Sequence, residues 1–184
     1  MRHSAEQLRL ERENPTELEH LPFESVINDD VVTDSLNLLQ RNLIGKNTFE
    51  LNTYASHTCW DMALEDSITG FSISELALSR GDCRTGKSKI LLEKLLYRKN
   101  NKAICEIKDE LLIESHDLDT YYTTLHVALT EKDSKHHYLV SYRDKREEII
   151  TTIHKLWLID LIHGKLTPVN VPAQFKFNNP DYLE

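Results

Sequence analysis

The residues best suited to chemistry in this sequence form a phosphate-loop pattern. Residues 81–88 read GDCRTGKS and match G-x-x-x-x-G-K-[ST] through Gly81, Gly86, Lys87 and Ser88. In a phosphate loop, backbone N–H groups hold phosphates at the start of a helix, the lysine pairs with the outer phosphates, and the hydroxyl binds Mg²⁺. Asp160 stands at the end of an apolar run. Phosphate-loop enzymes place an acidic residue at such a position, where it orients the water molecules bound to Mg²⁺. The pattern indicates a Mg-nucleotide site as one alternative.

The elements around this motif weigh against that alternative. A phosphate loop follows a buried parallel strand, but residues 72–80 read as a helix that opens with a capping box, S-x-x-E, and ends at Gly81. Asp160 precedes a turn at residues 163–164, which favours an antiparallel hairpin over the crossover helix that nucleotide folds require. We interpret residues 81–88 as a joint between two helices with an accidental match.

The patterns that would indicate a metal site or a catalytic nucleophile are weaker than the phosphate-loop pattern. The nine histidines show neither an H-x-x-x-H nor an H-E-x-x-H spacing, which would place two ligands on one helical face. The cysteines form no Cys-x-x-Cys pair, and their odd count favours a reducing compartment. They are Cys59, Cys83 and Cys105. We expect no metal, no cofactor outside the nucleotide alternative and no catalytic residue, and we favour a protein that is not an enzyme.

Charge is segregated along the chain. The formal net charge is −8, which disfavours non-specific nucleic-acid binding and favours a basic partner. Residues 1–30 carry eight acids and three arginines, whereas residues 79–102 carry eight bases and two acids. The basic stretch is interpreted as a solvated helix face that offsets the acidic segment. A phosphate-bearing or acidic partner is the alternative.

Hydrophobic periodicity predicts helices in the first half of the chain. Residues 1–30 form an acidic helical arm that begins with a capping box, and Leu36, Leu39 and Leu43 have helical spacing. From Lys87 to Lys99 the leucines fall on one helical face, as in an amphipathic helix. We therefore expect residues 87–99 to be the best-defined helix.

The second half has a period of two, which predicts strands. Apolar and charged residues alternate over 103–113, and further strands are expected over 121–130, 138–142, 149–162 and 165–171. Short connections between them imply an antiparallel meander of about five strands. Pro168 cannot donate a ladder hydrogen bond, which places the last strand at an edge.

These elements predict an α+β fold, with N-terminal helices packed on a C-terminal antiparallel meander. Residues 31–182 form a single domain after the acidic arm, and residues 183–184 are interpreted as a vector-derived scar. The longest apolar runs have four residues, far short of the ~20 that span a bilayer. We expect a soluble, cytoplasmic protein without a membrane anchor.

Three functions remain open. The first is a small acidic, non-catalytic protein that binds a basic protein partner, as an immunity or inhibitor protein does. The candidate contact residues are Glu17, Glu19, Asp29, Asp30, Tyr121 and Tyr122. The second is the nucleotide alternative described above. The third is a structural or assembly subunit that docks through its basic segment.

Overall fold

The computed structural model describes residues 38–51, 56–64, 70–85, 87–114, 117–143 and 146–182. The predicted acidic arm and the C-terminal scar lie outside the described residues. The helices are α3 (Thr48–Leu51) and α4 (Asp82–Thr85). The strands are β1 (His57–Ala63), β2 (Phe71–Ala77), β3 (Ser88–Lys99), β4 (Lys102–Ile113), β5 (Thr120–Val127), β6 (His136–Arg143), β7 (Ile149–Ile150), β8 (Ile153–Asp160), β9 (Lys165–Val169) and β10 (Phe177–Asn178).

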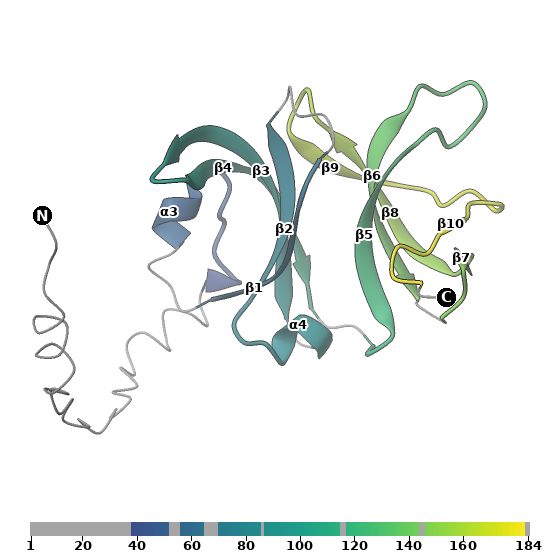
Figure 1. Ribbon diagram of the computed structural model, residues 1–184, viewed down its shortest axis with the longest axis horizontal. Helices are drawn as coiled ribbons and strands as arrows, with labels where there is room; N and C mark the ends of the chain where they lie inside the picture. The colour runs from purple at the N-terminus through teal and green to yellow at the C-terminus, as the bar shows by residue number, and fades with distance from the viewer. Residues whose placement is uncertain are drawn as a thin grey trace, which may run out of the picture.

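Two four-stranded antiparallel sheets dominate the fold (Figure 1). Sheet A has the order β1-β2-β3-β4 and sheet B the order β5-β6-β8-β9, while β7 and β10 form a small third pair. The expectation of an α+β fold with helices packed on a five-stranded meander is therefore wrong. The predicted antiparallel meander is confirmed in part, because the strands of sheet B pair antiparallel in the order β5, β6, β8 and β9. Its first predicted strand, β4, belongs to sheet A.

The segment predicted as the best helix is strand β3, and burial on both faces explains the error. On one face, Ile90 and Leu92 pack into the core between the two sheets. On the opposite face, Leu91 packs beneath the segment that contains Leu38 and Leu51. A strand covered on both faces reads as a continuous apolar run, and this run imitates the leucine spacing of a helix.

The predicted helix over residues 72–80 is likewise a strand, β2. Its capping-box residues, Ser72 and Glu75, lie in the ladder opposite Glu93 and Ile90 of β3. Ile73 packs in the core between the sheets, and Leu76 packs with Leu91 on the opposite face, so both faces of β2 are also covered. Tertiary burial thus overrides the local helix signals in this half of the chain.

The two sheets pack face to face. Ile73, Ile90 and Leu92 of sheet A meet Leu139 and Trp157 of sheet B in one core. One pair of sheet edges, β4 and β9, is held together by a side chain. Asp109 Oδ2 accepts a hydrogen bond from Leu166 N at 2.8 Å. The strand β9 is an edge strand, which confirms the position predicted from Pro168.

The outer face of sheet B is covered by the C-terminal segment. Tyr142, Val140 and Leu156 pack against Ile150 of β7 and Phe177 of β10. The predicted strand over 149–162 is divided into β7 and β8, because residues 151–152 leave the ladder. In the part of the chain that the structure describes, no helix is long and apolar enough to cross a membrane.

Candidate functional site, a groove between β1 and β5

A cavity of about 310 Å³ opens where the edge strand of sheet A comes near the edge strand of sheet B. We call it the β1–β5 groove. The β1 strand contributes Trp60, Asp61 and Met62, and β5 contributes residues 120–123. The two edges touch where Thr124 Oγ1 lies 2.8 Å from Met62 Sδ. Among the described strands, β1 and β5 each pair with a strand on one side only, so both present an open edge at this groove.

Aromatic rings form the walls of the groove. The ring centroid of Tyr121 lies 6.0 Å from that of Tyr142, and Tyr142 packs edge-to-face on Phe177 at 5.3 Å. Tyr142 is buried, whereas Tyr121 is 41% exposed. Rings packed in this way give a rigid apolar surface with an exposed outer ring, which suits a contact site because little side-chain entropy is lost on binding.

A buried polar cluster lies behind this wall. Ser88 Oγ donates to Glu75 Oε1 at 2.6 Å, and both residues are buried. Tyr122 lies near this pair, and burial raises the pKa of its phenol, with the charge of Glu75 adding to the rise and a hydrogen bond with Ser141 opposing it. Tyr122 therefore remains a neutral phenol at physiological pH, because its ordinary pKa already lies far above that range.

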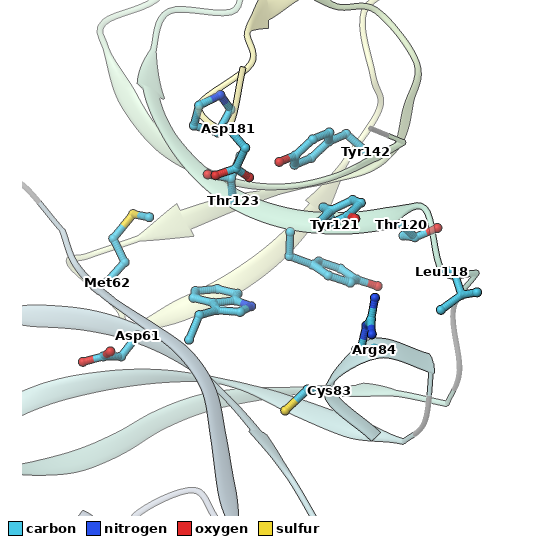
Figure 2. Close-up of a pocket in the computed structure, with 13 residues that line it drawn as sticks. Asp61, Met62, Cys83, Arg84, Leu118, Thr120, Tyr121, Thr123, Tyr142 and Asp181 are labelled. Carbon is cyan, nitrogen blue, oxygen red and sulfur yellow. The ribbon is translucent and has the colours of Figure 1, made fainter. Parts of the chain in front are cut away.

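The groove has a charge at each end. Figure 2 shows Arg84 rising from α4 beside Leu118, while Met62 and Asp61 lie on the opposite side of the view and Asp181 lies above them. None of these three charged side chains makes an ion pair with another residue that the structure describes. A ligand with both a cationic and an anionic group matches this arrangement.

A disulfide holds the Arg84 end in place. Cys59 of β1 and Cys83 of α4 are bonded, with their Cα atoms 5.4 Å apart. The prediction that all cysteines are reduced and unpaired is therefore wrong for these two. Cys105 is the free thiol among the cysteines and is buried. Because α4 has only four residues, it cannot be stable through its own hydrogen bonds, and the covalent link fixes the position of Arg84.

The structure separates the residues of the phosphate-loop pattern. Lys87 is exposed and its Nζ lies 2.7 Å from Glu114 Oε2, while the Ser88 hydroxyl is committed to Glu75. The motif is followed by β3 instead of the expected helix, so these residues lack the helix N-terminus that holds phosphates. Gly81 precedes α4, and Gly86 lies outside the described residues.

Asp160 has a local role in the turn between β8 and β9. Its carboxylate accepts hydrogen bonds from the backbone N–H groups of Ile162 and His163, each at 2.9 Å, and contacts His163 Nδ1 at 2.6 Å. The His163 backbone hydrogen bond, followed by that residue's side chain, holds the pKa of Asp160 below its usual range. This carboxylate closes a turn on sheet B, and the structure does not bring it into the β1–β5 groove.

Of the predicted contact residues, the structure brings two together. Tyr121 and Tyr122 both line the groove, whereas Glu17, Glu19, Asp29 and Asp30 lie outside the described residues. Sequence reasoning missed Trp60, Arg84 and Asp181, because they come from three segments that only the tertiary fold assembles. The alternation of residues 138–142 predicted that Tyr142 shares one face of a strand with Tyr138 and Val140, and the structure confirms this.

Metal-ligand groups do not gather in the described parts of the chain, where no three histidine, cysteine, aspartate or glutamate side chains could hold one ion.

Comparison of the chain with protein families, with curated proteins and with solved structures gives no match.

Proposed function

We propose that this protein is a non-catalytic binding protein whose β1–β5 groove takes an extended, basic segment of a partner protein. The observation that carries the proposal is the meeting of two open strand edges at an aromatic groove. An extended peptide can add to an exposed sheet edge, with main-chain hydrogen bonds giving affinity and side-chain pockets giving specificity.

The side chains of the groove favour a basic segment. Asp61 and Asp181 supply negative charge, and the faces of Trp60 and Tyr121 can attract a lysine or arginine through cation–π contacts. The formal net charge of −8 steers a basic partner toward the whole molecule. Arg84 at the other end would receive a carboxylate or a main-chain carbonyl of the same segment.

A defined peptide tests this proposal. The probe is a short labelled peptide that alternates lysine with valine, and its binding is followed by fluorescence anisotropy. We expect wild type to bind it, and the double variant Asp61→Asn/Asp181→Asn to bind about tenfold more weakly, since each exposed charge pair contributes up to about 1 kcal/mol. Tyr121→Ala should weaken binding by a similar factor.

A matched control removes the same charge elsewhere. Glu131 and Asp133 are exposed in the loop between β5 and β6, outside the groove. Glu131→Gln/Asp133→Asn should bind the lysine peptide within about twofold of wild type, since loss of a distant surface charge contributes little. Equal weakening in the groove and loop variants, or no binding by wild type, would overturn the proposal.

A further inference from the structure

A second charged surface lies at the far end of the β3–β4 hairpin. Strand β2 ends opposite Lys94, and Leu95 N donates to Gly70 O at 2.7 Å, so from Leu96 onward β3 pairs with β4 alone among the described strands. We call residues 95–103 the tip ribbon. The hairpin turns at Asn100 and Asn101, whose φ values are 50° and 62°. Asparagine tolerates this left-handed region, and two such residues give the tight turn that suits the twist of a two-stranded ribbon. Figure 1 shows β3 and β4 together forming one side of sheet A.

The tip ribbon concentrates cations without compensating acids. Arg98, Lys99 and Lys102 are exposed, and none of them makes an ion pair with another residue that the structure describes. Lys99 and Lys102 are direct cross-strand partners. Like charges placed directly opposite each other destabilise a β-ladder, and a bound anion between them would relieve this repulsion.

The same ribbon exposes apolar surface and an open strand edge. Leu96 is 51% exposed and Tyr97 is 55% exposed. The ladder shifts register between Leu95 and Tyr97, so Leu96 has no partner on β4 and forms a bulge. Bulges redirect side chains at sheet edges. Because β2 ends before this point, the edge of β3 from Leu96 to Lys99 is not paired with another described strand.

The other bases of residues 79–102 lie outside the tip ribbon, and most of them have a partner or a place elsewhere in the fold. Of the eight bases in residues 79–102, Lys87 and Lys89 are paired with Glu114 and Glu110. Arg84 belongs to the groove, and Lys94 lies 5.5 Å from the ring centroid of Phe71. Arg80 is exposed just after β2, at the end of that strand opposite the tip ribbon. The remaining three of the eight bases are the cations of the tip ribbon.

We infer that the tip ribbon binds a short acidic segment of a partner protein, which carries an apolar residue for Leu96 and Tyr97. This surface is separate from the groove and does not depend on the function proposed for it. A short segment is favoured over nucleic acid, because the chain has a formal net charge of −8 and the ribbon offers only three cations. A long polyanion would extend beyond these cations and be repelled by the negative charge of the molecule as a whole.

The test compares two anionic probes of equal charge. One is a labelled peptide that alternates glutamate with valine, and the other is a single-stranded DNA oligonucleotide. Anisotropy should show that wild type binds the peptide more tightly than the oligonucleotide, with affinity that falls as salt rises. Lys99→Gln/Lys102→Gln should weaken peptide binding about tenfold, and Arg98→Gln about threefold.

Two controls keep the result interpretable. Lys132→Gln/Lys135→Gln removes two exposed charges from the β5–β6 loop and should leave peptide affinity within about twofold of wild type. The ribbon variant should melt at or slightly above the temperature of wild type, since it removes a like-charge pair. The inference fails if the loop variant weakens binding as much as the ribbon variant, if neither probe binds, or if the oligonucleotide binds more tightly.

Discussion

Cys59 Sγ on β1 is bonded to Cys83 Sγ on α4, and this link places Arg84 at one end of the groove. The two cysteines are 24 residues apart in sequence, with the whole of β2 between them. The bond therefore closes a loop around a core strand and also joins β1, at the edge of sheet A, to the four-residue helix α4.

Thiol counting and unfolding test the disulfide. Denatured without reductant, the oxidised protein should show one reactive thiol, from Cys105, and after reduction it should show three. Cys59→Ala/Cys83→Ala should lower the free energy of unfolding by about 3 kcal/mol in a urea titration, because the unfolded chain regains loop entropy. Three free thiols in the oxidised protein, or an unchanged urea midpoint in the double variant, would contradict this assignment.

A buried ion pair beneath residues 38–51 should contribute strongly to stability. Lys89 Nζ lies 2.8 Å from Glu110 Oε1 and also donates to the Arg41 carbonyl, with only 3% of the Lys89 side chain exposed. Lys89→Met leaves the Glu110 carboxylate without its cation, and removing one partner of a buried pair typically costs about 3 kcal/mol. We expect that loss in the free energy of unfolding, measured by urea denaturation.

The matched control for this pair is an exposed ion pair just beyond the joined ends of β3 and β4. Lys87 and Glu114 are 58% and 65% exposed, although their charged atoms are only 2.7 Å apart. Lys87→Met should cost less than about 1 kcal/mol, since solvent screens an exposed pair. Similar losses for Lys87→Met and Lys89→Met would show that burial does not set the contribution of these pairs.

Glu93 should make stability fall with rising pH. Burial raises the pKa of its carboxyl above the ordinary 4.5, although a hydrogen bond donated by Ser74 Oγ opposes the rise. The folded state therefore binds more protons than the unfolded state, and the free energy of unfolding falls as pH increases from 4.5 through the raised value. Glu93→Gln removes the buried charge and should raise the melting temperature at neutral pH.

The pH dependence of the melting temperature checks this sign. The difference between Glu93→Gln and wild type should be positive at neutral pH and shrink below pH 4.5, where the wild-type carboxyl is protonated in both states. A Glu93→Gln variant that is less stable than wild type at neutral pH would contradict the desolvation assigned here.

The stranded half of the chain could be predicted because sheet B and β4 keep a period of two. In β6, Tyr138, Val140 and Tyr142 share one face, and this alternation is visible in the sequence. The first half could not be predicted in the same way. Ile90, Leu91 and Leu92 are all buried, since each face of β3 meets a different layer, and no alternation survives to distinguish a strand from a helix.

The residues of the groove could be predicted from the sequence only in part, because most of them are brought together by the tertiary fold. Tyr121 and Tyr122 could be named as contact residues because tyrosine offers a large contact area at a low cost in side-chain entropy. Asp181 and Arg84 are distant from them in sequence, and nothing local marks either residue. The disulfide was hidden as well, because an odd cysteine count does not show which two cysteines meet.

The most direct test of the proposed function is amide hydrogen exchange with and without the peptide that alternates lysine with valine. If the peptide adds to the open edges at the groove, exchange should slow over His57–Ala63 and Thr120–Val127, because their edge N–H groups gain hydrogen bonds. Exchange over the β5–β6 loop should be unchanged. Protection confined to other segments, with both edge strands unaffected at saturating peptide, would contradict the proposal.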